Sequence, residues 1–228
     1  MGGIDAPDAE EELRAAAAGR QSVIFVLEGA TLEVAKVGKN YELLNCDDHV
    51  SFLKRHGKDP AAYRPDICHQ TLLTILDSPL NKAGKIKAVY VHTAKNVLIS
   101  VNPAVRLPRT LRRFSGLAVQ LLQRLSIRAA QGSDRLLRVV KGPVTRLLPA
   151  DAHRIGFSRA ADTLAPASAH VARLDDEKPV VFVLGAFAHG HVDDSYVDQY
   201  VAISQYPLSA AYASARLCNA LEQKWDIV

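Results

Sequence analysis

Short hydrophobic runs that are rich in β-branched and aromatic residues recur along the chain and predict buried β-strands. They cover residues 22–27, 88–92, 97–101 and 180–184, with a briefer candidate at 201–204. The four residues 93–96 separate the second run from the third and predict a hairpin turn. We therefore expect these two neighbouring strands to form an antiparallel pair.

Two segments carry hydrophobic residues at the three- and four-residue spacing of an amphipathic helix. The first, residues 109–127, has a stripe made of Leu111, Phe114, Leu117, Ala118, Leu121, Leu122 and Leu125. The second begins at Pro207, a residue type that suits the first position of a helix. Its apolar face is predicted to comprise Leu208, Ala211, Tyr212, Ala215, Cys218 and Leu221. A short polar helix is also expected at residues 193–199.

The alternation of strands and helices favours an α/β fold with a mainly parallel sheet and helices on both faces. A length of 228 residues suits one such domain, which we expect to span residues 21–228. Residues 1–20 are acidic and alanine-rich, and we expect them to form a flexible leader outside the core.

Composition narrows the class of protein. The chain is 48% hydrophobic and 23% charged, which is typical of a soluble globule and excludes intrinsic disorder. No apolar run approaches the roughly 20 residues of a membrane helix, and no secretory signal opens the sequence. Cys46, Cys68 and Cys218 lie far apart without a CxxC motif, so neither a disulfide framework nor a structural zinc site is predicted. We expect a reduced, intracellular protein.

Basic charge is concentrated in one block of the chain. Residues 104–146 contain ten Lys or Arg and one acid, although the whole chain carries a net charge of only +4. Such asymmetry is typical of a protein with an anionic partner, and the alternative is a solvated helix face whose counter-charges come from elsewhere in the fold. A cluster at the start of the predicted helix comprises Arg106, Arg109, Arg112 and Arg113. Helix N-termini bind phosphates. The helix dipole disfavours cations at this end of a helix, so arginines that stand there indicate a functional role.

Arg64 and Asp66 form a second candidate site. Two residues apart in an expected extended segment, they point to the same side of the chain, so that the carboxylate can fix the guanidinium through a charge-assisted bond. A purely structural ion pair at the surface is the alternative interpretation.

A glycine-containing loop follows the predicted strand at residues 180–184. Gly185 and Gly190 stand where α/β folds bind nucleotides, because glycine lets the backbone approach a ligand. Their spacing matches neither GxGxxG nor a P-loop, so a tight turn is the alternative. His189 and His191 lie in or beside this loop, but no further side chains complete a metal-ligand set, and no metal is predicted.

Several long motifs, taken together, identify a family. They are residues 64–70 (RPDICHQ), 76–84 (LDSPLNKAG), 101–110 (VNPAVRLPRT), 116–128 (GLAVQLLQRLSIR) and 203–210 (ISQYPLSA). The chain resembles the eukaryotic and archaeal small-subunit rRNA pseudouridine-N1-methyltransferase family, within the SPOUT superfamily of knotted methyltransferases. The resemblance extends over about residues 22–228, almost the whole chain.

The resemblance implies a trefoil-knotted α/β domain that forms a homodimer and binds S-adenosylmethionine at the knot. Cofactor-binding positions of the family match Gly185, Gly190, Ile203, Ser204, Gln205, Tyr206, Pro207 and Leu208. Family positions that hold rRNA match Arg64, Arg106, Arg109 and Arg113, and Arg112 stands beside them. The aspartate that matches Asp66 steadies the arginine that matches Arg64.

The chain departs from the family pattern in two places. Arg146 stands where relatives often carry Asp, which adds positive charge. Residues 154–176 align poorly, so a further cofactor contact expected there has no assigned residue.

The implied activity is N1-methylation of a pseudouridine in small-subunit (18S) rRNA during 40S subunit biogenesis. A nuclear, nucleolar location and small-subunit assembly factors as partners are implied with it, and no membrane partner. We expect Arg64 to stabilise negative charge on the base, while Asp66 is a weaker candidate for a general base because its pairing with Arg64 lowers its pKa. Two alternatives stay open: a SPOUT ribose 2′-O-methyltransferase, and an assembly factor that mainly binds pre-rRNA.

Overall fold

The computed structural model describes residues 21–130, 134–189 and 195–228, so the predicted leader at 1–20 lies outside the described residues. The strands are β1 (Val23–Ala30), β2 (Val34–Val37), β3 (Asn40–Leu43), β4 (Ile86–Thr93), β5 (Leu98–Val101), β6 (Ser126–Arg128), β7 (Arg135–Val140), β8 (His153–Phe157), β9 (Val180–Gly185) and β10 (Gln199–Val201). The α-helices are α2 (Val50–Arg55), α3 (Pro65–Asp77), α4 (Pro79–Lys82), α5 (Leu111–Arg124), α6 (Ala167–Ala172) and α7 (Ala210–Lys224), and two 3-10 turns are η1 (Pro60–Ala62) and η2 (Val144–Arg146).

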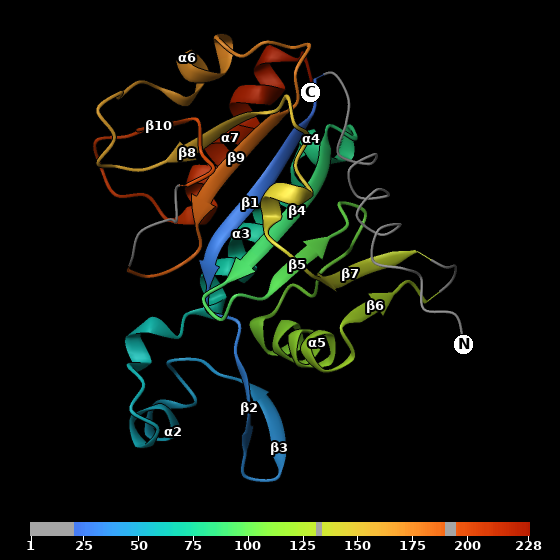
Figure 1. The fold of residues 1–228 in the computed structure, drawn as a ribbon, viewed down its shortest axis with the longest axis vertical. Coiled ribbons are helices and arrows are strands. Elements are labelled where there is room, and N and C mark those ends of the chain that lie inside the picture. The colour runs from blue at the N-terminus through green and yellow to red at the C-terminus, as the bar shows by residue number, and fades with distance from the viewer. Residues whose placement is uncertain (1–20, 131–133, 190–194) are drawn as a thin grey trace.

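One large sheet organises the fold, with the strand order β10-β8-β9-β1-β4-β5-β7-β6 (Figure 1). From β10 to β4 every neighbouring pair is parallel, and β5, β7 and β6 extend the sheet through antiparallel pairs. The predicted α/β fold with a mainly parallel sheet is confirmed. The predicted hairpin between β4 and β5 is also confirmed, and Asn96 supplies its left-handed residue at φ 57°.

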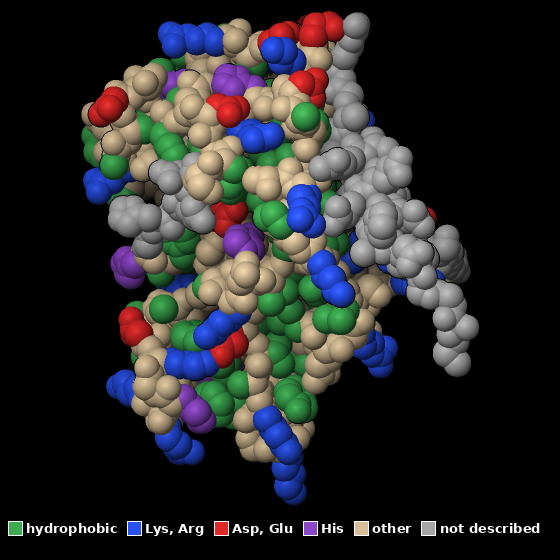
Figure 2. Space-filling view, viewed as in Figure 1, with side chains coloured by type: hydrophobic (Ala, Val, Ile, Leu, Met, Phe, Trp, Pro, Cys, Tyr) green, Lys and Arg blue, Asp and Glu red, His purple; other side chains and the backbone are tan. Residues whose placement is uncertain are grey.

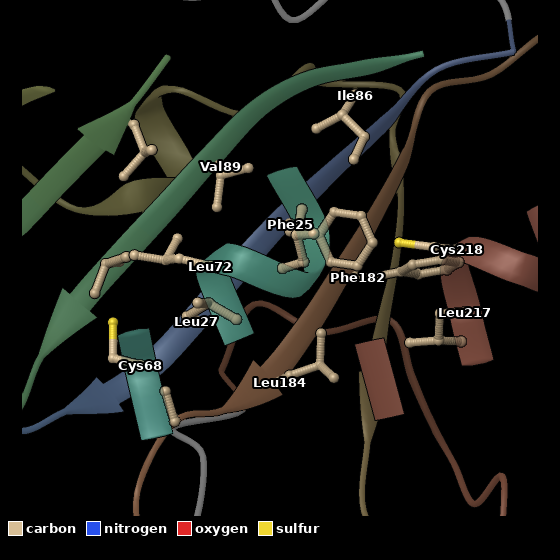
Figure 3. Packing of buried hydrophobic residues seen from close by; sticks show 14 of the residues in the cluster. Phe25, Leu27, Cys68, Leu72, Ile86, Val89, Phe182, Leu184, Leu217 and Cys218 are labelled. Atoms are coloured by element: carbon tan, nitrogen blue, oxygen red, sulfur yellow. The ribbon is translucent and has the colours of Figure 1, made fainter. Parts of the chain in front are cut away.

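The long helices α3, α5 and α7 cover one face of the sheet and bury its larger hydrophobic core. Figure 3 shows Phe25 and Phe182 of adjacent strands facing side chains of α3 and α7. The two rings meet edge to face with their centroids 5.7 Å apart. Cys68 of α3 and Cys218 of α7 lie in this core, and burial raises the pKa of each thiol to about 12, so both behave as small hydrophobic side chains.

The opposite face of the sheet has a different cover. Ile24 and Val26 of β1 pack there against Val144, Leu147 and Leu148, which belong to η2 and the residues after it. The prediction of helices on both faces is therefore confirmed for one face only, which the long helices cover. On the other face, within the described part of the chain, the cover comes from the 3-10 turn and irregular chain.

The two predicted long helices exist with shifted ends. The first runs from Leu111 to Arg124 and ends where Leu125 adopts a left-handed conformation at φ 62°, which leaves that side chain 56% exposed. The second begins at Ala210 and not at Pro207, because Ser209 Oγ accepts a hydrogen bond from the Tyr212 backbone N–H at 3.1 Å and caps the helix there.

The later start also corrects the predicted apolar face of α7. The residues that it buries are Ala213, Ser214, Leu217, Cys218, Ala220, Leu221 and Glu222. Of the predicted face, Cys218 and Leu221 are buried, whereas Tyr212 is 57% exposed.

Three further elements differ from the prediction. Residues 195–198 form a turn and not a helix, while 193–194 lie outside the described residues. The predicted strand at 201–204 begins two residues earlier, as β10. Arg64 and Asp66 do not lie in an extended segment, because Pro65 begins α3. Among the described helices, none is long and apolar enough to cross a bilayer.

Residues 31–63 form a small unit beyond the end of β1, in the lower part of Figure 1. Leu44, Leu53 and Tyr63 make its own hydrophobic cluster. The Tyr63 hydroxyl donates to Glu33 at 2.8 Å, and the Cys46 N–H donates to the Tyr63 carbonyl at 2.9 Å. These contacts return the chain to the end of β1, where α3 begins.

Candidate functional site

A cleft of about 970 Å³ opens at the carboxyl ends of β8 and β9. Arg64, Ile67 and Gln70 line it from the first two turns of α3, and Gly185 and Phe187 line it from the end of β9. Leu208 to Ala211, at the start of α7, complete the wall. The cleft therefore joins the predicted Arg64 site to both predicted cofactor-binding segments, which are far apart in the sequence.

Arg64 is held at its backbone and at its side chain. Its N–H donates to Thr31 Oγ1 at 3.0 Å, just beyond the end of β1. Its Nε donates to Asp66 Oδ1 at 2.8 Å and its Nη2 to Oδ2 at 2.6 Å, so the predicted pair exists and is bidentate. Because both bonds fix the plane of the guanidinium, Arg64 presents its charge to the cleft in one orientation.

This ion pair stabilises both charged forms. The hydrogen bonds from Arg64 hold the pKa of Asp66 below its usual value, against the opposing effect of partial burial. Hydrogen bonding to Asp66 likewise raises the pKa of Arg64. An ionised carboxylate already engaged by a cation is a poor proton acceptor, so the geometry favours Asp66 as the residue that positions Arg64.

Gly185 is required by a neighbouring side chain. A Cβ at Gly185 would lie 2.7 Å from Cζ of the Phe187 ring, and a Cβ at Gly29 would lie 2.5 Å from Cδ1 of the same ring. Gly29 also has φ +71°, a conformation that favours glycine. The two glycines therefore seat Phe187 against the ends of β1 and β9. Gly185 also lines the cleft, so its predicted role in cofactor binding stays a prediction.

The second cofactor segment surrounds a smaller hollow of about 210 Å³. Its lining includes Ile203, Ser204, Tyr206, Pro207 and Leu208, and Leu208 also lines the main cleft. Ser204 Oγ accepts a hydrogen bond from the Tyr206 N–H at 3.0 Å, which shapes the turn before α7.

The remaining predicted cofactor residues are placed less fully. Gln205 is exposed and does not line either hollow, and Gly190 lies outside the described residues, as does His191. Among the residues that the structure describes, no group of three or more His, Cys, Asp or Glu side chains is placed to hold a metal ion.

Sequence reasoning missed several wall residues, among them two that line both hollows. Phe157 and Ser158, at the end of β8, line both hollows. They fall in the poorly aligned segment 154–176 where a further cofactor contact was expected. A hydrophobic residue that ends a strand and is followed by Ser is too common a pattern to have identified them.

The predicted arginine cluster lies outside the cleft and is exposed. Arg106 and Arg109 belong to the loop before α5, and Arg112 and Arg113 belong to its first turn. Arg109 Nη1 donates to Asp77 Oδ2 at 3.2 Å. The first turn of α5 contains no acidic residue, so the helix N-terminus adds to the positive potential of the arginines.

His69 joins this cluster to α3 and was not singled out from the sequence. Its Nε2–H donates to the Pro108 carbonyl at 2.7 Å, and its ring stacks on Phe114 with centroids 4.4 Å apart. The arginine loop is thus braced against the helix that begins at Arg64. In the view of Figure 2, Lys and Arg side chains project around the lower half of the molecule, where α2, α5 and the β2–β3 hairpin lie in Figure 1.

The family is decided by comparison with known proteins. The family model described as EMG1/NEP1 methyltransferase matches residues 25–222. The chain belongs to this family. The ribosomal RNA small subunit methyltransferase NEP1 of Mus musculus is 52% identical over 210 residues, which cover 92% of this chain and 84% of that protein. The Nep1 protein of Thermococcus kodakarensis is 32% identical over 170 residues, covering 74% of this chain and 75% of that protein.

A solved structure shows the same fold. The crystal structure of Archaeoglobus fulgidus Nep1 bound to S-adenosylhomocysteine matches with a TM-score of 0.66 and 23% identity. The match covers 91% of this chain and all of that chain. The EMG1/NEP1 fold is therefore present here, and its sheet ends carry the cleft described above.

Replacing Asp66 tests the ion pair through pH. The pKa of Asp66 is lowered by folding, so its stabilising contribution is complete above the ordinary Asp range and is lost as pH falls through the lowered value. For a pair that is partly exposed, Asp66→Asn should cost roughly 1 kcal/mol of unfolding free energy at neutral pH. Urea unfolding from pH 7 downward should show this cost disappearing in acid. Asp151→Asn, at an exposed position, is the control, and a pH-independent cost would contradict the ion-pair account.

A Cβ at position 185 should be tolerated only if the Phe187 side chain is replaced by a smaller one. Gly185→Ala forces the ring out of its seat and should cost about 1–3 kcal/mol of stability, as other overpacked sites do. The double variant Gly185→Ala, Phe187→Leu should recover much of that loss, because leucine lacks the ring atoms that collide. Urea unfolding of the two single variants and the double variant measures the coupling, and additive effects would show that Phe187 is not the constraint.

Proposed function

We propose that this protein transfers a methyl group from S-adenosylmethionine to N1 of a pseudouridine in small-subunit rRNA. The observation that carries the proposal is the shared cleft, which Arg64 lines together with Gly185 and Leu208. Small-subunit rRNA methylation is the activity named in relatives that are about 50% identical over most of the chain. Family membership and the geometry therefore point to the same class of reaction.

The residues of the cleft fit the cofactor. A volume of about 970 Å³ lies at the upper end of the range of small-molecule sites, about 300–1,000 Å³. Phe157 and Leu208 offer apolar surface for an adenine ring, and the turn at Ser204–Leu208 adds backbone groups for hydrogen bonds. When bound, S-adenosylmethionine supplies an electrophilic methyl group on its sulfonium.

The side chains of the chain itself prepare the nucleophile. Pseudouridine has a free N1–H because its glycosidic bond is to carbon. Loss of that proton leaves negative charge on the base, and N1 then attacks the methyl group, so that the base ends neutral and S-adenosylhomocysteine is released. Arg64, fixed by Asp66, stabilises this charge at the cleft. The target base has to leave its stack to enter the cleft, so a looped-out nucleotide is the expected substrate.

The exposed arginines bind the rest of the RNA. Arg106, Arg109, Arg112 and Arg113 contact phosphates outside the cleft and orient the hairpin, without reading the base. Such binding weakens steeply with salt, because each phosphate contact releases counterions. Their position outside the cleft also favours the second candidate function, in which the protein acts mainly as a pre-rRNA-binding assembly factor.

The family resemblance extends the proposal to the cellular setting. The protein acts as a knotted homodimer in the nucleolus, together with small-subunit assembly factors. A further hollow of about 380 Å³ is lined by residues of α3 and α7, together with Arg109. Ala215 and Cys218 in its wall are small, and small side chains let another helix approach, which supports the homodimer. A single methyltransferase domain over residues 21–228 belongs to the same proposal.

Mass spectrometry of a methylated RNA tests the reaction. A small-subunit rRNA hairpin with pseudouridine in its loop should gain the mass of one methylene group when incubated with the protein and S-adenosylmethionine. The matched hairpin with uridine should gain nothing, because its N1 is bonded to ribose. Methylation of both RNAs would instead identify a ribose 2′-O-methyltransferase. No methylation, with tight and salt-sensitive binding, would leave the assembly factor as the function.

Replacing Arg64 tests its electrostatic role. Arg64→Gln keeps a polar side chain but removes the charge, and kcat should fall about 10²–10³-fold, as it does when a charge-stabilising donor is removed elsewhere. Single-turnover kinetics with saturating RNA separates this effect from binding. Arg173→Gln, on the exposed surface after α6, is the matched control. Unchanged kcat with weakened RNA binding would show that Arg64 only holds the RNA.

A further inference from the structure

Glu28 is a buried carboxylate that belongs neither to the Arg64–Asp66 ion pair nor to the residues that line the cleft. It lies near the end of β1, its side chain is 6% exposed, and it points to the sheet face opposite the long helices, as its neighbours Val26 and Ile24 do. Burying a carboxylate away from water is costly unless its oxygens are fully engaged. The partners of Glu28 therefore indicate why it is there.

Both carboxylate oxygens of Glu28 accept hydrogen bonds from other elements. The Tyr196 hydroxyl donates to Oε1 at 2.5 Å, and His92 Nδ1 of β4 lies 2.7 Å from Oε2. A carboxylate oxygen is the acceptor in both contacts, so the Tyr196 hydroxyl and His92 Nδ1–H are the donors. His92 Nε2 in turn lies 2.9 Å from Asn96 Oδ1 in the β4–β5 turn. We name Glu28, His92 and Tyr196 the Glu28 clasp.

The backbone of Glu28 contacts the first residue of the connection that follows β9. Glu28 pairs with Gly185 in the β1–β9 register, and its carbonyl accepts a hydrogen bond from the Ala186 N–H at 2.7 Å. Ala186 begins the connection from β9 to β10, and Tyr196 lies near its end. One residue of β1 thus fastens this connection at both ends, through its backbone at the first and its side chain at the second.

The beginning of this connection forms part of the cleft wall. Phe187, Ala188 and His189 line the cleft directly after Ala186. Phe187 is seated on Gly29, the residue after Glu28, and on Gly185. The backbone bond at Ala186 and the ring seat at Phe187 therefore set the same stretch of wall, and the bond to Tyr196 ties the far end of the connection to the same strand.

We propose that Glu28 is a positioning residue for cofactor binding, because the Glu28 clasp sets the cleft wall that follows Gly185. This inference rests on the proposed function, since it assigns the cofactor to that wall. A cleft wall that is already held in place loses less conformational freedom when the cofactor binds, and this increases the affinity for the cofactor. Arg64 and the exposed arginines do not contact the Glu28 clasp, so RNA affinity should not depend on it.

Tyr196→Phe is the sharpest test, because it removes one hydroxyl and leaves the ring. Calorimetric titration with S-adenosylhomocysteine should show a dissociation constant raised about tenfold, the effect expected for one hydrogen bond to a charged group. Fluorescence anisotropy with a labelled rRNA hairpin should show RNA affinity unchanged within about twofold. Tyr212→Phe makes the same chemical change at an exposed position outside the cleft and should alter neither affinity.

Glu28→Gln provides a second, conservative variant. Its amide oxygen still accepts from one partner, so cofactor affinity should fall less than in Glu28→Ala, with RNA affinity again retained. Thermal unfolding of each variant reports whether the fold is intact. If Tyr196→Phe does not fold, the comparison of Glu28→Gln with wild-type protein decides the matter.

The outcomes separate the clasp from the proposed function. Wild-type protein that fails to bind S-adenosylhomocysteine overturns the proposed function and the clasp with it. Wild-type protein that binds it, with unchanged affinity in Tyr196→Phe and Glu28→Gln, overturns the clasp alone. Parallel losses of cofactor and RNA affinity would show that Glu28 acts only on general stability, and would also overturn it.

Discussion

The parallel pairing of β1 with β9 is the contact on which the rest of the structure depends. It runs in unbroken register from Val23 opposite Val180 to Glu28 opposite Gly185. Because parallel strands end at the same edge of a sheet, this register brings the loop after β9 beside the residues that follow β1. Thr31 there holds the backbone of Arg64, and Gly29 seats Phe187. A shift by one residue would turn every β1 side chain to the wrong face and would separate these contacts.

The arginines predicted to contact RNA divide into two kinds. Arg64 is fixed by its backbone and by both oxygens of Asp66, so its charge has a direction before any ligand arrives. The arginines around the start of α5 are exposed and have long, flexible side chains, which suits attraction to a phosphate backbone at variable geometry. His69 connects the two groups, since it belongs to α3 and holds the loop before α5. Arg64 thus supplies a charge at a fixed position, and the arginines around the start of α5 supply longer-range attraction to RNA.

Sequence reasoning succeeded where a signal is local and failed where tertiary contacts decide. The runs that became β1, β4 and β9 are hydrophobic on both faces, and the Arg64–Asp66 pair needs only two neighbouring residues, so both could be predicted. The start of α7 could not, because Pro207 suits the first position of a helix and Ser209 suits the N-cap, and the hydrogen bond from the Tyr212 N–H to Ser209 Oγ decides between them. Glu28 gave no signal in sequence, because its three partners come from remote segments. Phe157 and Ser158 were missed because a hydrophobic residue followed by Ser is too common a pattern to indicate a cleft wall.

The central place of β1 has a consequence for how the chain folds. On one side β1 pairs with β4, which follows soon in the sequence, but on the other it pairs with β9, near the end of the chain. During synthesis that second edge stays without its partner until most of the protein has been made, and an open hydrophobic strand edge invites association with other chains. Parallel pairs of such long sequence separation also form slowly. The same contact that assembles the cleft can therefore be completed only after β9 has been synthesised.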